Sequence, residues 1–296
     1  MSLKKSVRLQ IAGAYLILLI ASHVVEGTPA EPARSPEIRT ASIHAVNHDQ
    51  IQSRTIHLAY RDTAPESTRI PVVLVHGSPG SGEVLKKLAG LLTPRFRVIV
   101  PDLPGFGAST LNLPDYSFRA HGDYLIELLD ALHVDRAQFV GFSMGGGVVL
   151  SITDRAPQRV ASIVMLSAIG VQEHELTGSY QVNHFLHGAQ LALLWTLQNG
   201  FPHFGRFRQS PLTVEYARNF YDSDQRPLRT ILAQYRGPML IIHGTRDRNV
   251  PIAAALEHHR LVPQSEIVEF DDNHFMAFMN PGKFLDPLMR FLSDER

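Results

Sequence analysis

The chain has 296 residues, 44% of them hydrophobic, which is enough for one large α/β domain or two small ones. Its 28 basic and 28 acidic residues cancel, so the overall charge gives no indication of binding to nucleic acid or to acidic surfaces. The absence of cysteine excludes disulfides, a thiolate nucleophile and cysteine-ligated metal.

The first segment of the chain differs in character from the rest. Lys4, Lys5 and Arg8 give it a basic start, and residues 9–25 include no acidic residue, lysine or arginine. A basic start followed by an apolar run is typical of a secretory signal peptide, which also needs a small-residue cleavage site. The candidate cleavage sites near Gly27 are poor, and the apolar run is close to the lower limit of about 17 residues for a transmembrane helix.

We therefore predict that residues 1–27 are a signal peptide or an N-terminal membrane anchor. If the segment stays uncleaved, residues 7–25 are expected to contact the membrane. Both alternatives place the remainder of the chain outside the cytoplasm, because basic flanks stay on the cytoplasmic side. The protein would then be secreted, periplasmic or held by a single-pass anchor.

Residues 28–50 are predicted to form a linker ahead of the main domain. Three prolines near the start of this segment are typical of an extended tether. Short alternating runs at residues 43–46 and 54–60 have the pattern of an antiparallel hairpin. Residues 51–296 are predicted to form one α/β domain.

Strands and helices alternate through this domain. A continuous apolar run at residues 70–75 predicts a strand buried on both faces, and residues 96–100 predict the next buried strand. Further strands are predicted at residues 137–140, 160–166, 238–243 and 266–270. Apolar residues at helical spacing predict helices at residues 83–92, 118–132, 144–155, 252–261 and 283–292. This alternation is typical of parallel βαβ units, so we predict an α/β fold whose mostly parallel central sheet has helices on both faces.

The alternation is interrupted between about residues 171 and 236, where no strand-like run occurs. Helical pieces lie at residues 184–198 and 213–222. Because an insertion of this length is not a plain loop, we predict a helical cap over the strand ends. We expect its apolar side chains to form the core of the cap and to line part of an acyl pocket. Trp195, the only tryptophan of the chain, is the candidate substrate-binding residue among them.

A serine motif joins a predicted strand to a predicted helix in the sequence Gly141-Phe142-Ser143-Met144-Gly145. Gly-x-Ser-x-Gly at such a junction is typical of a nucleophile elbow, a sharp turn that holds a serine above the edge of a sheet. The glycines leave room where a Cβ would collide with a neighbouring strand or helix. A glycine-rich structural turn is the alternative interpretation of these five residues taken alone.

A candidate acid and a candidate base follow at later strand ends. A serine hydroxyl is a weak nucleophile at neutral pH and needs an adjacent base, which in turn needs an orienting carboxylate. Asp247 lies just after the strand at 238–243, and His274 lies just after the strand at 266–270. Because functional side chains of such sheets gather at the carboxyl ends of strands, we predict that Ser143, Asp247 and His274 meet there.

Five segments carry a family resemblance: His76-Gly77-Ser78-Pro79-Gly80, Asp102-Leu103-Pro104-Gly105-Phe106-Gly107-Ala108-Ser109, Gly141-Phe142-Ser143-Met144-Gly145, Gly244-Thr245-Arg246-Asp247 and Asn273-His274-Phe275. With them the chain resembles the α/β-hydrolase-fold superfamily, in the group of cap-bearing esterases, lipases and carbon–carbon bond hydrolases. The resemblance covers roughly residue 52 to the C-terminus. It implies Ser143 as nucleophile, His274 as base and Asp247 as the partner of the histidine, in the chain order of that fold.

The resemblance also implies two backbone donors for an oxyanion. In this fold one donor is the N–H of the residue after the nucleophile, here Met144, at a helix N-terminus where the dipole favours negative charge. The second donor comes from the loop after the strand that ends at His76, and Ser78 is the candidate.

Other polar residues have structural interpretations. We interpret Asp102 as a residue that shapes its Pro-Gly-rich loop and His76 as a residue that braces the loop after its strand. Asp271 and Asp272 lie too near His274 in sequence to reach its far nitrogen, and we expect them to shape their own loop.

The remaining histidines do not predict a metal site. His243, His258 and His259 are interpreted as strand-end and surface residues. His184 and His187 have a spacing that suits a metal, but no carboxylate matches it, so we expect a solvated or substrate-facing pair. No dinucleotide- or phosphate-binding glycine motif opens a helix, so we predict neither a metal nor a cofactor.

We therefore expect a serine hydrolase that cleaves a carboxylic ester, or a related acyl bond, through an acyl-enzyme. Two alternatives stay open: a carbon–carbon bond hydrolase or cofactor-free lyase that uses the same residues, and a non-catalytic binding protein on a hydrolase scaffold. The expected partner is a small-molecule ester or acyl substrate and not nucleic acid. The sequence specifies neither the substrate nor the oligomeric state.

Overall fold

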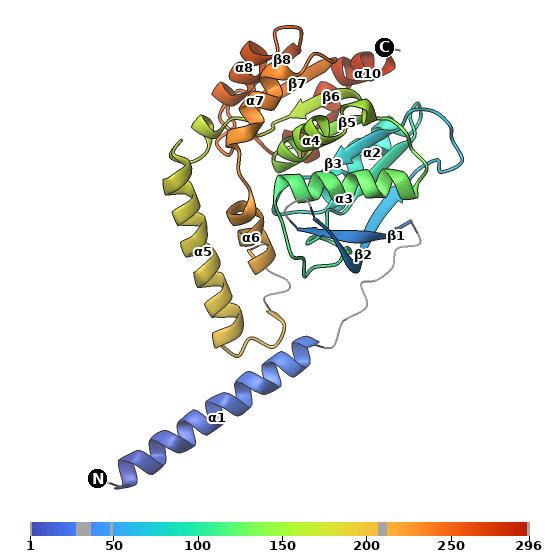
Figure 1. Cartoon of the computed structure of the whole chain (residues 1–296). Coiled ribbons are helices and arrows are strands. Elements are labelled where there is room, and N and C mark those ends of the chain that lie inside the picture. Colours follow the sequence, from blue (N-terminus) through green and yellow to red (C-terminus); the bar gives the residue numbers. More distant parts are fainter. Residues whose placement is uncertain (1, 28–36, 48–49, 207–211, 295–296) are drawn as a thin grey trace.

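The computed structural model describes residues 2–27, 37–47, 50–206 and 212–294. Their eight strands are β1 (Arg39–Asn47), β2 (Gln50–Asp62), β3 (Val72–Val75), β4 (Val98–Pro101), β5 (Ala137–Phe142), β6 (Val160–Leu166), β7 (Met239–Gly244) and β8 (Glu266–Phe270). They form one sheet in the order β1-β2-β4-β3-β5-β6-β7-β8 (Figure 1). The pairs β1–β2 and β2–β4 are antiparallel and all other pairs are parallel, which confirms the predicted mostly parallel sheet.

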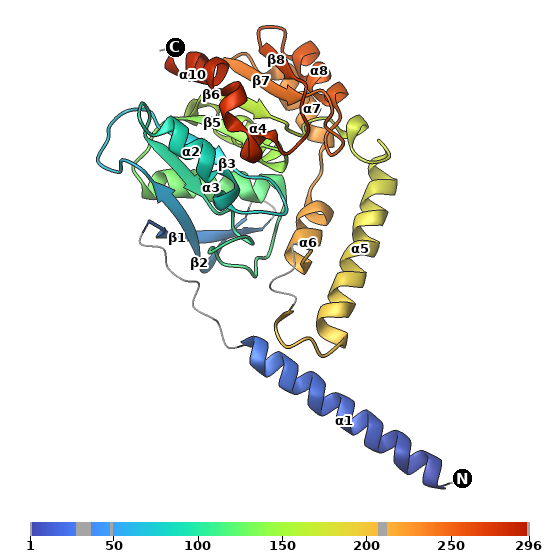
Figure 2. The ribbon, with the colours of Figure 1, turned by 180° about the vertical axis from the view of Figure 1, so that it is seen from behind.

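Helices cover both faces of the sheet (Figures 1 and 2). One face packs on α3 (Phe118–Ala131), α4 (Met144–Arg155), α7 (Arg226–Gln234) and α8 (Ile252–Leu261). The other face packs on α2 (Lys86–Leu92), α9 (Met276–Met279) and α10 (Leu285–Ser293). Every residue of β3, β4, β6 and β7 is buried, which is why these strands are continuous apolar runs in the sequence. We call the sheet and these helices the body.

The predicted boundary between linker and domain is wrong. Residues 39–47, placed in the linker, form β1, so the α/β domain begins at Arg39 and not at residue 51. β1 pairs with β2 along its length and buries Ile43 and Ala45 in the core beside α3. The sheet edge and α3 provide the apolar contacts that hold this segment as a strand. Residues 28–36 lie outside the described part of the chain.

Two helices between β6 and β7 stand apart from the sheet. They are α5 (Tyr180–Gly200) and α6 (Val214–Asp222), which lie side by side (Figures 1 and 2). We call these two helices, with the segments around them from residue 171, the cap. After α6 the chain returns to the body through α7, which packs against α4 and α8. α7 is not among the helices predicted from the sequence. Pro227 follows its first residue, where proline is tolerated because the first N–H groups of a helix have no intrahelical acceptor.

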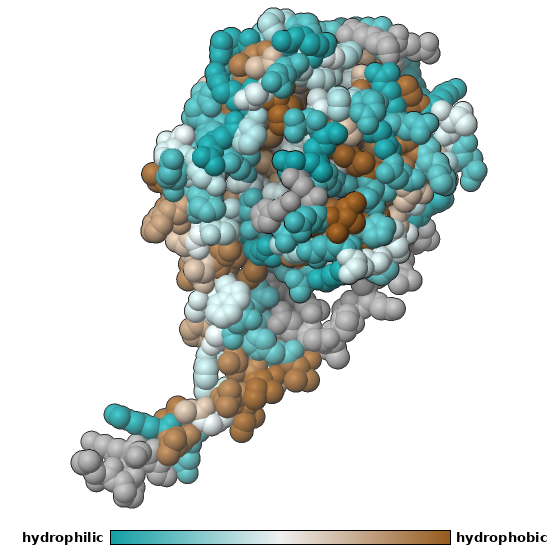
Figure 3. All heavy atoms as spheres, viewed as in Figure 1, coloured by the Kyte–Doolittle hydropathy of each residue, from teal (hydrophilic) through white to brown (hydrophobic). Residues whose placement is uncertain are grey.

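The N-terminal segment forms one long helix, α1 (Ser2–Gly27), which extends away from the body (Figure 1). Its window Val7–Val24 has a mean hydropathy of 1.6, and only 6% of that window is buried. Figure 3 shows the apolar surface that this helix exposes. By length and composition the helix suffices to cross a membrane, and an N-terminal signal sequence has the same features.

Candidate active site

Ser143 occupies a strained turn between β5 and α4. Its backbone has φ 54° and ψ −119°, a conformation that L-residues adopt rarely, and α4 begins at the next residue. A Cβ on Gly145 would lie 2.3 Å from the carbonyl oxygen of Val75, and a Cβ on Gly141 would lie 2.7 Å from the carbonyl oxygen of Gly145. Glycine at both positions is therefore required for the turn, and the predicted nucleophile-elbow geometry is present.

The structure brings the predicted acid and base to this serine. His274 Nε2 lies 3.1 Å from Ser143 Oγ, and His274 Nδ1 lies 2.8 Å from Asp247 Oδ2. The second carboxylate oxygen, Asp247 Oδ1, accepts the N–H groups of Asn249 at 2.8 Å and Val250 at 2.9 Å. These bonds fix the carboxylate, so Nδ1–H donates to it and Nε2 is left to accept the serine proton.

A second histidine stands close to the same carboxylate. His243 Nε2 is 3.6 Å from Asp247 Oδ2 and 2.9 Å from the carbonyl oxygen of Val250. Burial lowers the pKa of His243, so the imidazole is neutral at pH 7 and its N–H donates to Val250. The predicted strand-end role of His243 is confirmed, and His243 braces the loop that carries Asp247.

The two predicted oxyanion residues, Ser78 and Met144, line the same pocket as Ser143. Gly77 permits the close approach of its loop, because a Cβ there would lie 2.8 Å from Ser143 Cβ. The fully buried His76 holds this loop, with its Nε2 accepting the N–H of Leu103 at 2.9 Å and its Nδ1 2.8 Å from the carbonyl oxygen of Gly77. Burial lowers the pKa of His76, which agrees with a neutral, bracing imidazole.

The loop residues behind this site have the structural roles predicted for them. Asp102 accepts the N–H of Gly82 at 2.7 Å and the N–H of Ala108 at 2.9 Å, and so closes its own loop. Asp272 forms an ion pair with Lys283 on the far side of the His274 loop. Neither carboxylate hydrogen-bonds to His274 among the contacts of the described residues.

A pocket of about 810 Å³ lies between the body and the cap, above Ser143. Its lining combines apolar and polar side chains. The apolar residues are Pro79, Val84, Phe142, Met144, Ile169, Val171, Leu176, Leu186, Phe220, Val250, Phe275 and Phe278. Beside Ser78 and the triad, the polar ones are His174, Glu175, His187, Gln190, Tyr216, Gln225, Arg248 and Asn249.

Glu175 is the principal polar group of the cap wall. Its carboxylate accepts from Gln172 Nε2 at 2.7 Å and Asn183 Nδ2 at 3.2 Å, and its Oε1 lies 3.3 Å from His187 Nε2. Burial by itself would raise the pKa of Glu175, but hydrogen bonds from these three side chains outweigh it and lower the pKa. The carboxylate is therefore ionised at neutral pH and presents a fixed negative charge to the pocket.

Glu175 is not among the predicted site residues, because it does not lie at helical spacing from the two histidines of α5. Glu175 instead precedes α5 and reaches His187 through the turn at its start. His184 does not join His187; its ring stacks between Tyr180 and Tyr221, at centroid distances of 5.3 and 4.3 Å.

Two sequence predictions fail at this point. The indole of Trp195 is 58% exposed and is not among the pocket residues, so its predicted substrate contact is not present. The reason is the direction of α5, whose body-facing side carries Leu186 and His187 and whose opposite side carries Trp195. His258 is fully buried and not a surface residue, and burial lowers its pKa to about 3.

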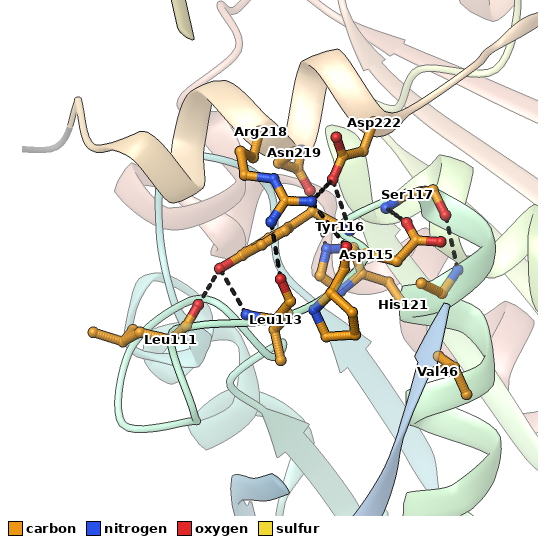
Figure 4. A network of polar contacts seen from close by, with 12 residues as sticks. Val46, Leu111, Leu113, Asp115, Tyr116, Ser117, His121, Arg218, Asn219 and Asp222 are labelled. Carbon is orange, nitrogen blue, oxygen red and sulfur yellow. Dashed lines mark hydrogen bonds and ion pairs between the residues drawn. The ribbon is translucent and has the colours of Figure 1, made fainter. Parts of the chain in front are cut away.

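A network of polar contacts docks α6 of the cap onto the body (Figure 4). Arg218 donates to the carbonyl oxygens of Leu113 and Pro114 at 2.9 Å each, and pairs with Asp222 at 2.7 Å. Its guanidinium also lies over the ring of Tyr116, 4.7 Å from the centroid. Because each donor faces an acceptor, this network fixes α6 against the loop before α3.

Helix α6 also contacts Met144, the residue that follows Ser143. Asn219 of α6 is fully buried and donates through Nδ2 to the sulfur of Met144, while its Oδ1 lies 3.0 Å from His121 Nε2. Burial lowers the pKa of His121 to about 4, so the neutral ring donates to Asn219. The position of the cap is thus linked to the turn that holds Ser143. No motif in the sequence pointed to Asn219, since its partners lie far away along the chain.

The comparisons with known proteins agree with this architecture. Residues 70–213 match the family model described as alpha/beta hydrolase fold. The 2-hydroxy-6-oxo-2,4-heptadienoate hydrolase of Pseudomonas putida is 28% identical over 268 residues, which cover 76% of this chain and 90% of that protein.

Two solved structures are similar in fold. The esterase of Thermogutta terrifontis, with malate bound, has a TM-score of 0.67 at 24% identity, and the match covers 86% of this chain and 98% of that one. The meta-cleavage product hydrolase of Pseudomonas fluorescens has a TM-score of 0.66 at 22% identity, with 88% and 100% covered. With the matched segment at residues 70–213 and the strand order described above, they show that the chain has the α/β-hydrolase fold.

Proposed function

We propose that this protein is a serine hydrolase that cleaves a carboxylic ester, or a related acyl bond, of a small molecule. The observation that carries the proposal is the placement of His274 within hydrogen-bond reach of both Ser143 and Asp247. Nucleophile, base and orienting acid in this arrangement are the parts that acyl transfer needs.

The proposed reaction proceeds in two halves. Ser143 Oγ attacks the ester carbonyl while His274 Nε2 takes its proton, and Asp247 stabilises the imidazolium that forms. The N–H groups of Ser78 and Met144 donate to the oxyanion. His274 then gives the proton to the departing alkoxide, which leaves as the alcohol, and the acyl group stays on Ser143 as an ester.

In the second half, water attacks this acyl-enzyme. His274 accepts a proton from the water, the second tetrahedral intermediate collapses, and the proton returns to Ser143 as the carboxylic acid departs. The apolar walls of the pocket suit an apolar acyl chain, and the ionised Glu175 of the cap wall suits a partner group that donates a hydrogen bond.

The test is labelling and turnover with the full-length protein. A fluorophosphonate probe should label Ser143, and a series of p-nitrophenyl esters of increasing acyl length should be hydrolysed. Absence of both labelling and turnover in folded protein would favour a non-catalytic binding protein and overturn the proposal.

Carbon–carbon bond hydrolysis is the second candidate, and it is favoured by one observation. The Pseudomonas putida relative named above is a 2-hydroxy-6-oxo-2,4-heptadienoate hydrolase, and its match covers 90% of that protein. Product analysis with a vinylogous diketone and with a simple ester under the same conditions separates the two candidates. A kcat/KM that is higher for the diketone by a factor of ten or more, about 1.4 kcal/mol in transition-state binding, would favour the carbon–carbon hydrolase.

We further propose that α1 is retained as a membrane anchor and that the body lies on the extracytoplasmic side. Support comes from the hydropathy of Val7–Val24 and from the basic residues that precede this window. N-terminal sequencing of protein recovered from membranes after extraction at high pH tests this. A mature N-terminus beyond residue 27, with the protein in the soluble fraction, would instead indicate a cleaved signal peptide.

A further inference from the structure

The far end of the cap exposes a group of large apolar side chains. The 21 residues of α5 include no aspartate, glutamate, lysine or arginine. Near its end and in the turn that follows, four large apolar side chains are each between 48% and 59% exposed: Leu193, Trp195, Phe201 and Phe204. We call these four residues the cap tip. Exposed apolar groups gathered in this way mark a surface that binds something other than water.

The cap tip lies beside α1 (Figures 1 and 2). Ser22 of α1 is buried, and its Oγ accepts the N–H groups of His203 and Phe204 at 2.7 Å each. Tyr15, two turns earlier in α1, donates its hydroxyl to the carbonyl oxygen of Gly200. The contact therefore runs along α1 from Tyr15 to Ser22.

The position of this contact along α1 sets the depth of the cap tip. Tyr15 and Ser22 both lie inside Val7–Val24, the window that is apolar enough to cross a membrane. At 1.5 Å per residue, Tyr15 lies about 14 Å along the helix from Val24, roughly half of a hydrocarbon core about 30 Å thick. A membrane that contains this window therefore also surrounds the segment that packs against it.

We propose that the cap tip is immersed in the extracytoplasmic leaflet of a lipid bilayer, packed against α1. Inside a membrane, backbone polar groups need partners within the protein. The turn after α5 meets this need at its contact with α1, because Ser22 takes two of its N–H groups and Tyr15 binds a carbonyl. Aromatic side chains such as Trp195 favour the boundary between acyl chains and headgroups.

Lipid is a better occupant of this surface than a second copy of the chain. The apolar surface of the cap tip continues onto α1, whose window is almost wholly unburied, so a partner has to cover both elements together (Figure 3). A bilayer covers both at once. The surface is also free of charged side chains along all of α5, as the interior of a leaflet requires.

The only tryptophan of the chain gives a direct test, because its fluorescence comes from the cap tip alone. The full-length protein is reconstituted into phosphatidylcholine vesicles, with or without bromine on the acyl chains. The expected result is a blue-shifted emission that brominated lipid quenches and aqueous iodide does not. Emission that stays at the position of solvent-exposed indole and is quenched by iodide would overturn the proposal.

Two further results would contradict immersion of the cap tip in lipid. A blue shift that brominated lipid leaves unquenched, and that disappears when protein is diluted in the vesicles, would indicate contact with a second copy and overturn the proposal. Soluble protein with α1 cleaved off would overturn it as well. Because none of these readouts is enzymatic, they are independent of whether Ser143 is the nucleophile.

Two matched variants test whether the cap tip itself enters the bilayer. Phe204→Asp puts a charge into the cap tip, and Leu256→Asp puts one on α8, at a side chain with the same exposed fraction of 48%. Phe204→Asp should reduce the quenching of Trp195 by brominated lipid and restore quenching by iodide, and Leu256→Asp should change neither. Equal quenching in the two variants and the parent protein would contradict insertion of the cap tip.

Discussion

The body buries most of its apolar side chains, whereas the cap leaves several large ones exposed. In the body, the residues of β3, β4, β6 and β7 are all buried. The turns that follow β5, β7 and β8 carry Ser143, Asp247 and His274 in that order. In the cap, α5 buries only Asn183 and His187 and leaves large apolar side chains exposed. A site that must hold atoms within tenths of an ångström is thus placed on the close-packed part, and the part with the looser packing forms the other wall of the pocket.

We expect substitutions of the triad residues, which the body carries, to abolish catalysis with little change in stability. Substitutions in the cap should instead change stability and substrate binding. The largest effect is expected for Ser143→Ala, because Ser143 is the pocket hydroxyl that lies within hydrogen-bond reach of His274. Ester hydrolysis should fall by a factor of roughly 10⁴–10⁶, measured as kcat/KM with p-nitrophenyl esters. Ser151→Ala, a buried serine on α4 outside the pocket, is the control and should retain activity.

Asp247→Asn should have the next largest effect. The amide cannot stabilise the imidazolium and favours the wrong tautomer of His274, so kcat should fall by roughly 10⁴. Fluorophosphonate labelling should slow in parallel, while the circular dichroism spectrum stays the same. Asp271→Asn changes an exposed carboxylate of the neighbouring loop and serves as control. Equal activity in the two variants would show that the contact between Asp247 and His274 has no catalytic role.

Arg218→Ala tests the docking of the cap. It removes hydrogen bonds to two backbone carbonyls and leaves Asp222 partly buried without its partner. We expect the free energy of unfolding to fall by about 1–3 kcal/mol, with KM raised more than kcat is lowered. The control Arg260→Ala breaks a surface pair with Glu257 on α8 and should leave the free energy of unfolding almost unchanged. If the control destabilises as much as Arg218→Ala, the network is not what holds the cap.

Glu175→Gln should have the smallest effect on stability, and this effect should depend on pH. The pKa of Glu175 in the folded protein is below its ordinary value of 4.5, so its stabilising contribution is complete above that pH. As the pH falls from 4.5 through the folded pKa, the unfolded chain takes the proton first and the contribution is lost. Urea unfolding midpoints should therefore drop less steeply in acid for Glu175→Gln than for the parent protein, and Glu66→Gln, at an exposed site, should match the parent.

Local sequence patterns were sufficient to predict most strands and helices of the body. β6, β8, α4 and α8 begin and end at the predicted residues, because each combines a clear apolar pattern with a clear boundary. The predicted antiparallel hairpin is present as β1 and β2, but the linker was expected to reach residue 50, whereas pairing with β2 and packing against α3 extend the sheet back to Arg39. α7 was not predicted, and a proline lies in its first turn.

The sequence by itself determined the sheet, the turn around Ser143 and the order of Ser143, Asp247 and His274, because glycine spacing and strand ends are properties of short stretches of chain. Only the tertiary structure decided which cap residues face the pocket. Glu175 lines the pocket beside His187, Asn219 contacts Met144 beneath it, and Trp195 is exposed outside it. The direction of a side chain on a helix depends on what the helix packs against, and for α5 that information lies in the body, in α6 and in α1.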